Sequence, residues 1–218
     1  MEYPVSRVAK YAIENPSSIR EIMTVVTDYR LHPEKYPRKL VYLGGGWPQD
    51  SPPPVLIEMV QELIKNKDFL IETCRYGTTR GQPYFIDGLV NYENYVFNRE
   101  ISKDELIVGS GSTDLIGAVF IATLDPESEV ILTKPAYLNY IRQLQVEMKL
   151  NVKIKTWPII KNYEFSPSLD KLQELITDKT KLIILTVPGN PDSRVFSNDI
   201  LNGVIDIADD KKIWVMID

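Results

Sequence analysis

Four stretches of this sequence carry residues that could do chemistry, and each follows a short apolar run. Small residues occupy positions 109–113 after "LIV", and the aromatic ring of Tyr137 follows "EVILTKPA". Asn190 comes after "KLIILTVPG", and Asp218 directly after "KKIWVMI". These residue types could supply an anion cradle, a stacking surface, an amide and a carboxylate. Such a set could bind a flat, phosphorylated ligand.

The small residues at 109–113, Gly-Ser-Gly-Ser-Thr, precede a predicted helix. Small side chains let the backbone approach a ligand, and the N–H groups at a helix start carry about half a positive charge. Gly111, Ser112 and Thr113 could therefore hold an anion, most often a phosphate. The stretch is not the dinucleotide fingerprint, because Asp114 stands where G-x-G-x-x-G needs its third glycine. An ordinary capped helix after a tight turn is the alternative.

Each of the other three residues has a simpler explanation when taken alone. Tyr137 could be a core or surface aromatic, Asn190 part of a plain turn, and Asp218 a chain end in solvent. A carboxylate directly behind five apolar residues would be partly desolvated unless a ligand nitrogen or a metal met it. Ligands of parallel sheets bind outside the carboxyl ends of the strands. We therefore expect the four stretches to meet at one edge of a sheet.

The elements that must position these residues alternate between strands and helices. Strands that are apolar on both faces, with helices between them, indicate a mostly parallel sheet covered on both sides. The fold class is therefore α/β: a mostly parallel sheet flanked by helices. The expected strands fall within 105–111, 129–135, 151–157, 181–191 and 211–218, and the helices between them within 112–124, 136–148, 168–176 and 198–208.

The first part of the chain lacks this alternation. Residues 1–45 are expected to form an N-terminal arm with a short helix around 17–29. Another helix should begin at the prolines 52–54, since proline is tolerated in a first turn, and a further one should span 83–98. One face of the helix after the prolines is apolar, through Val55, Leu56, Met59, Val60, Leu63 and Ile64.

Composition excludes several classes of function. The net charge of −5 and the absence of a Lys/Arg cluster argue against nucleic-acid binding. Cys74 is the single cysteine, so no internal disulfide is possible, and a reducing, cytoplasmic location is the simple interpretation. The single histidine, His32, excludes multi-histidine metal sites and lies in a solvated-looking loop. No apolar run approaches the ~20 residues that span a bilayer, so no membrane partner is expected.

Six motifs together resemble the class I/II aminotransferases, the fold type I enzymes that use pyridoxal 5′-phosphate (PLP). They are "GGGWP", "YGTTRG", "GSGSTDL", "KPAYLNY", "PGNP" and the terminal Asp, in that order. The resemblance runs from about Leu43 to Asp218, and it is nearest to the aromatic, 2-aminoadipate and kynurenine branch. It implies transfer of an amino group between an amino acid and a 2-oxo acid. By the same resemblance, residues 1–45 would be an N-terminal arm and small-domain segment, and residues 46–218 an incomplete PLP-binding large domain.

The resemblance also assigns roles to single residues. Gly111, Ser112 and Thr113 would hold the cofactor phosphate, and Tyr137 would stack on the pyridine ring. Asn190 would bond the ring's phenolic oxygen, in a loop whose Asn-Pro bond is often cis in the family. Asp218 would keep the pyridine nitrogen protonated, so that the ring can accept electrons from the substrate. In a homodimer, Tyr76 would reach the partner's cofactor phosphate, and the backbone N–H of Gly46 would meet the substrate carboxylate.

The sequence departs from the family pattern in several places. The family's "NPTG" reads Asn190-Pro191-Asp192-Ser193, and the usual Leu-Arg after the "YG…G" turn reads Phe85-Ile86. The Schiff-base lysine and the arginines that grip the substrate carboxylate lie further along family sequences than Asp218. Lys211 and Lys212 should lie at the opposite end of the last strand, and the motif gives Lys134 no catalytic role.

The missing lysine leads to the hypothesis that these 218 residues are the N-terminal part of a longer or split enzyme and are inactive alone. The Leu106–Val108 strand would then lack its neighbours. A non-catalytic remnant of the family, and an unrelated α/β nucleotide-binding domain, are the alternatives.

Overall fold

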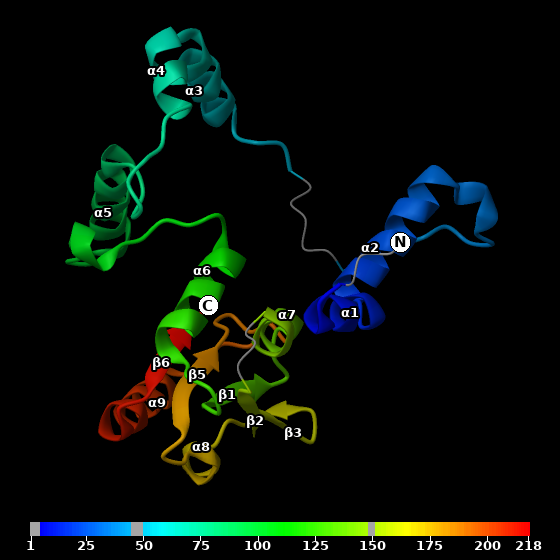
Figure 1. Ribbon diagram of the computed structural model, residues 1–218, viewed down its shortest axis with the longest axis vertical. Helices are drawn as coiled ribbons and strands as arrows, with labels where there is room; N and C mark the ends of the chain where they lie inside the picture. Colours follow the sequence, from blue (N-terminus) through cyan, green and yellow to red (C-terminus); the bar gives the residue numbers. More distant parts are fainter. Residues whose placement is uncertain (1–4, 45–49, 148–150) are drawn as a thin grey trace. The chain divides into compact units, whose positions relative to one another are not determined.

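The structure is a computed structural model that describes residues 5–44, 50–147 and 151–218 (Figure 1). The chain divides into two compact units, one formed by Met1–Thr24 with Ile116–Asp218 and the other by Val25–Leu115. We call them the sheet unit and the helical unit. The predicted division at residue 45 stays a prediction. Among the described residues, no helix is both long and apolar enough to cross a membrane.

The sheet unit is built on four parallel strands in the order β2-β1-β5-β6. The predicted α/β class with a mostly parallel sheet is therefore confirmed. Val130 lies opposite Ile154 on one side and Leu182 on the other, and Ile183 lies opposite Val215. The bounds are β1 Glu129–Lys134, β2 Lys153–Pro158, β5 Thr180–Leu185 and β6 Trp214–Ile217.

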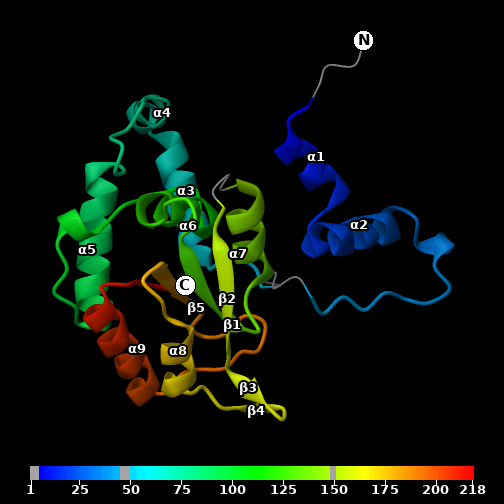
Figure 2. The ribbon, with the colours of Figure 1, turned by 60° about the horizontal axis from the view of Figure 1, so that its bottom comes forward.

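Helices cover both faces of this sheet, because side chains that alternate along β1 and β5 are apolar on both sides. Val130 and Leu132 pack with α6 (Ser112–Thr123) and α7 (Leu138–Arg142), through Phe120 and Tyr140. Ile131 and Ile183 face the other way, toward α8 (Leu169–Leu175) and α9 (Asn198–Lys211). Figure 2 shows α7 beside β1 and β2, with α8 and α9 across the sheet.

Three smaller elements complete the sheet unit. Helix α1 (Arg7–Glu14) begins after Ser6, whose side chain accepts a bond from Ala9 N. A π-helical turn, η3 (Gln143–Glu147), continues α7. Strands β3 (Ile160–Lys161) and β4 (Glu164–Phe165) form a hairpin outside the sheet. Its turn residues Asn162 and Tyr163 both have positive φ angles, which is the backbone of a type I′ turn.

Among its described residues, the helical unit contains helices and no strand. Helix α2 (Ser18–Leu31) enters it from the sheet unit, and α3 (Pro54–Lys65) begins at the predicted prolines. The apolar stripe of α3 is exposed rather than buried. The remaining elements are η1 (Pro33–Lys35), α4 (Lys67–Thr73), α5 (Pro83–Phe97) and η2 (Lys103–Glu105).

The predicted strand at Leu106–Val108 was wrong. This segment is extended but pairs with no strand among the described residues; Val108 N instead donates to Arg80 O at 3.0 Å. The Arg80 guanidinium also donates to the carbonyl oxygens of Lys103, Asp104 and Leu106. An apolar run becomes a strand only when a neighbouring strand takes its backbone bonds, and the described part of the chain offers none to this segment.

Gly203 allows α9 to pack closely against α8. A Cβ atom at this position would overlap Leu169 Cδ1. Both Gly203→Ala and Gly88→Ala gain helix propensity, but only at Gly203 must Leu169 move, so Gly203→Ala is expected to have a free energy of unfolding about 1 kcal/mol below that of Gly88→Ala. Urea unfolding measures this change. Gly88→Ala in α5 is the control, since a Cβ there meets no atom within 4 Å. Equal changes in the free energy of unfolding of both variants would contradict close packing at Gly203.

Candidate functional site

The candidate site lies where β1, β5 and β6 end. These strands are neighbours and run parallel, so the residues that follow them reach the same edge of the sheet. Tyr137 follows β1, Thr186 and Asn190 follow β5, and Asp218 follows β6. The structure therefore brings three of the predicted residues to one edge.

Asp218 is fixed in place by its own backbone. Asp218 N donates to Leu185 O, and Val187 N donates to Asp218 O, both at 2.9 Å. These two bonds continue the β5–β6 ladder by one step beyond the strands. The carboxylate therefore stands at a defined position on the sheet edge, although its side chain is exposed.

Tyr140, which we did not predict as a site residue, holds this carboxylate. Its hydroxyl donates to Asp218 Oδ2 and lies 3.0 Å from Thr186 Oγ1. The side chain is buried, with 1% of its surface exposed. Burial and the hydrogen bond to Asp218 both raise the pKa of Tyr140 far above its usual value of 10.0. The phenol is therefore a neutral donor to the carboxylate at any physiological pH.

Tyr137 lies beside this pair. It is the N-cap residue of α7 and is partly buried. Its ring meets the Tyr140 ring edge to face, with centroids 5.3 Å apart and planes at 85°. This contact fixes the plane of the Tyr137 ring next to the residue that holds Asp218. A flat ligand beside Asp218 would have an aromatic surface within reach.

Asn190 sits in a tightly bonded loop after β5. Gly189 N donates to Arg194 O at 2.7 Å, and Ser193 N donates to Gly189 O at 2.8 Å. The Asn190–Pro191 bond is cis, as the resemblance implied. Together with Pro135 and Thr186, Asn190 lines a small depression at the sheet edge. Since Thr186 also contacts Tyr140, the loop borders the cluster around Asp218.

Ser193 stands where the family motif has glycine. Its φ angle is +56°, in the left-handed region that costs a non-glycine residue about 1 kcal/mol. Ser193 therefore adopts a backbone conformation that glycine would favour.

Gly111, Ser112 and Thr113 lie in the helical unit, at the start of α6. The helix begins at Ser112 as predicted, and Gly111 has a φ angle of +89°. Ser110 N donates to Asp114 Oδ2 at 3.0 Å, so the Asp114 side chain caps this turn. Residues 110–115 and Asp218 belong to different units. Their meeting at one ligand stays a prediction.

Two further predicted residues belong to the helical unit of the chain. Tyr76 lies between α4 and α5 in the helical unit, and its side chain is fully exposed. Gly46 lies outside the described residues. Their proposed contacts with a partner's cofactor and with the substrate stay predictions.

The opposite edge of the sheet carries a separate cluster around Glu129, the first residue of β1. Its side chain is 6% exposed and pairs with Lys155 Nζ at 2.5 Å and Lys153 Nζ at 3.4 Å. Thr177 Oγ1 donates to Glu129 Oε2 at 2.6 Å. The hydrogen bond from Lys155, followed by that from Thr177, lowers the pKa of Glu129 from 4.5 to about 2. This network ties the starts of β1, β2 and β5 together.

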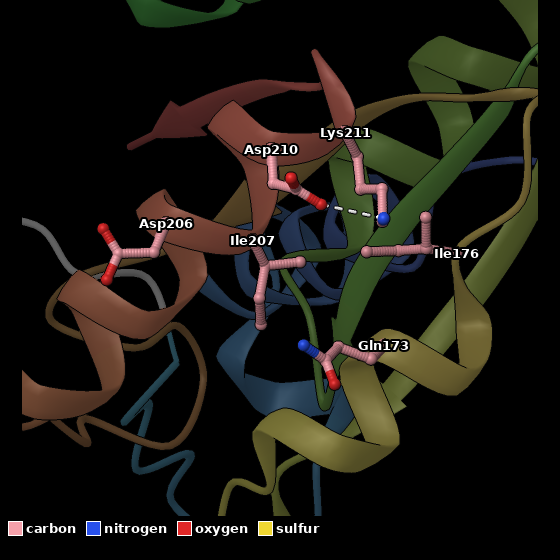
Figure 3. A pocket seen from close by; sticks show the side chains of 6 residues that line it. All are labelled: Gln173, Ile176, Asp206, Ile207, Asp210 and Lys211. Carbon is pink, nitrogen blue, oxygen red and sulfur yellow. Dashed lines mark ion pairs between the residues drawn. The ribbon is translucent and has the colours of Figure 1, made fainter.

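A groove of about 510 Å³ lies between α8 and α9 (Figure 3). Lys211 Nζ pairs with Asp210 Oδ2 there at 2.8 Å. Lys211 and Lys212 end α9 and precede β6, so they lie at the opposite end of that strand from Asp218, as predicted. The groove is lined by Gln173, Ile176, Asp206, Ile207, Asp210 and Lys211.

Comparison with known families gives a match over most of the chain. The family model described as aminotransferase class I and II matches residues 38–218. An aspartate aminotransferase of Sulfolobus acidocaldarius is 32% identical over 184 residues, which cover 83% of this chain and 44% of that protein. An aspartate aminotransferase of Thermotoga maritima is 28% identical over 180 residues, 82% of this chain and 45% of that protein.

Solved structures share the fold. The aspartate aminotransferase from Thermus thermophilus with maleate superposes with a TM-score of 0.82 at 19% identity, and the match covers 99% of this chain and 53% of that one. The aspartate aminotransferase from Thermotoga maritima gives a TM-score of 0.77 at 25% identity, over 98% of this chain and 53% of that one. The chain spans about half the length of the curated relatives it matches.

Proposed function

The chain belongs to the aminotransferase class I and II family, and on that premise we propose that its sheet edge binds PLP in an amino-transferring enzyme. PLP is the cofactor of this family. The observation that carries the proposal is the anchored carboxylate of Asp218 beside the Tyr137–Tyr140 ring pair. The match to the family favours this function over an unrelated nucleotide-binding domain.

The residues present fit the cofactor. Asp218 keeps a second carboxylate oxygen, and its exposed side chain can meet the pyridinium N–H of a bound ring. Tyr137 offers a ring face for stacking, and the Asn190 amide can donate to the phenolic oxygen. Bound PLP supplies an electron sink for the substrate's amino-bearing carbon. Asp218 holds a proton on the ring nitrogen by charge, and Tyr137 fixes the plane of the ring.

The remaining contacts in the proposal come from other parts of the chain. Gly111, Ser112 and Thr113 would hold the phosphate through the backbone and the start of α6, where the helix dipole favours an anion. The full exposure of Tyr76 is compatible with reaching the cofactor phosphate of a partner subunit in a homodimer. Gly46 would donate its backbone N–H to the substrate carboxylate.

We also propose that this chain cannot transfer amino groups alone. In the family pattern, the lysine that bonds the cofactor and carries the proton follows the Asp218 position. Lys211 and Lys212 cannot replace it, because they lie at the far end of β6. A continuation or a separate chain would then supply the lysine and the arginines that grip the substrate.

The substrates in this proposal are an amino acid and a 2-oxo acid. The "GGGWP" and "KPAYLNY" motifs suggest an aromatic or 2-aminoadipate-like amino acid. Relatives carry the name aspartate aminotransferase, and one from Saccharomyces cerevisiae is named a probable kynurenine–oxoglutarate transaminase. A substrate panel should therefore contain aspartate, kynurenine, phenylalanine and 2-aminoadipate.

Titration of the 218-residue chain with PLP tests the cofactor proposal. We expect saturable binding, seen as a change in the visible absorbance of PLP, with no lysine adduct trapped by borohydride. The complete protein, or this chain with its separate partner, should release a 2-oxo acid from one amino acid of the panel. Binding of PLP without any 2-oxo acid from the complete protein would indicate a non-catalytic member of the family. Affinity for nucleotides but not for PLP would contradict the proposal.

A further inference from the structure

We propose that Tyr140, supported by Thr186, is a positioning residue that fixes the Asp218 carboxylate for its ligand. The inference rests on the proposed function, because the ligand atom in question is the pyridine nitrogen of PLP. Tyr140 touches Asp218 rather than the expected place of the cofactor, so it acts through the carboxylate. It does not take part in the reaction itself.

The hydrogen bonds form a chain with a single direction. A tyrosine hydroxyl has one proton, and Tyr140 donates it in the hydrogen bond to Asp218 Oδ2. The contact of 3.0 Å with Thr186 Oγ1 must then use the threonine proton, with Tyr140 as acceptor. Donation therefore runs from Thr186 to Tyr140 and on to Asp218. Each bond polarises the next, which strengthens the final bond to the carboxylate.

The surroundings of Tyr140 keep these hydrogen bonds in one arrangement. Its side chain is 1% exposed and packs in the apolar cluster of Phe120, Leu132 and Ile184. The edge contact with Tyr137 holds its ring from a second side. The phenol is therefore held in a fixed position beside Asp218 Oδ2. Tyr140 is also one helical turn after Tyr137, so α7 carries both the ring surface and the support for the carboxylate.

The hydrogen bond from Tyr140 orders the exposed side chain of Asp218 before a ligand binds. Without a partner, an exposed aspartate turns freely between rotamers, and ordering it would oppose ligand binding. With Oδ2 held, the carboxylate is already oriented and keeps Oδ1 for the ligand. A charged group that is oriented before the ligand arrives strengthens ligand binding and, in active sites, stabilises the transition state.

Three variants of the chain, each titrated with PLP, test this role. Tyr140→Phe removes only the hydroxyl and keeps the ring contact, and we expect PLP to bind about tenfold more weakly. Thr186→Val removes the second donor, and we expect a loss of about threefold. Thr186→Ser keeps that hydroxyl, so its affinity should equal that of the wild type. Thermal melting checks that each variant is folded, and the Thr186 pair provides the comparison if Tyr140→Phe does not fold.

A ligand-free measurement separates this inference from the proposed function. The Tyr140 hydroxyl proton, buried and bonded to a carboxylate, should exchange slowly and be visible by NMR in the PLP-free protein. It should disappear or move strongly in Asp218→Asn. A wild-type protein that does not bind PLP would overturn the proposed function. Tight PLP binding that is unchanged in Tyr140→Phe and Thr186→Val would overturn the positioning role alone.

Discussion

Replacement of Asp218 by asparagine is expected to lower amino transfer by the complete enzyme about a thousandfold. The amide cannot hold a proton on the pyridine nitrogen by charge, so the bound ring becomes a poorer electron acceptor. Removal of one preorganised group at a developing charge typically costs 10²–10³-fold in rate. The rate of 2-oxo acid formation at saturating amino acid measures this effect.

A matched control for Asp218→Asn is Asp206→Asn in α9. Asp206 is exposed and lines the groove between α8 and α9 (Figure 3). Asp218 is not among the residues that line this groove. Asp206→Asn makes the same chemical change without altering the candidate site, so the variant should form 2-oxo acid at the wild-type rate. Asp218→Asn activity within tenfold of the Asp206→Asn value would contradict the assigned role of Asp218.

Replacement of Glu129 by alanine is expected to have the largest effect on stability, a loss of about 3 kcal/mol. The substitution leaves Lys155, whose side chain is only 16% exposed, without its carboxylate. Breaking a buried ion pair from one side typically costs about 3–5 kcal/mol. Glu127→Ala is the control, because its pair with Lys179 is exposed and should contribute less than about 1 kcal/mol. Urea unfolding at neutral pH measures both variants.

The same carboxylate predicts how stability depends on pH. The pKa of Glu129 falls from 4.5 to about 2 on folding, so the unfolded chain takes up this proton first as the solution is acidified. The stabilisation is fully present above about pH 4.5 and is lost progressively as the pH falls toward 2. Wild-type protein should therefore lose about 3 kcal/mol more than Glu129→Gln over this range. If the free energy of unfolding of the two proteins fell in parallel with pH, Glu129 would not be stabilised as a carboxylate by Lys155 and Thr177.

Strong periodic patterns predicted most of the large elements. The helices α6 and α9 were expected within a few residues of their observed bounds, and Ser197 caps α9 by accepting from Ile200 N. The helices α1 and α4 were missed although their caps are visible in the sequence. Asn66, for example, accepts from Phe69 N at the start of α4. Short helices bury too little apolar surface for a clear period, so such caps are their main signal.

Contacts between distant parts of the chain explain the predictions that failed. The Leu106–Val108 run is apolar enough for a strand, but strand formation depends on a neighbour that local residues do not specify. Tyr140 could have been found, because it follows Tyr137 by three residues and so shares its side of the helix. Thr186 could not, because its contact with Tyr140 joins residues 46 positions apart.

The most direct test of the account uses PLP labelled with ¹⁵N in its ring and bound to the protein. The chemical shift of that nitrogen reports whether it carries a proton. We expect a protonated nitrogen in the wild type at pH 8 and an unprotonated one in Asp218→Asn. An unprotonated nitrogen in the wild type, or the same shift in both proteins, would contradict the claim that Asp218 meets the ring.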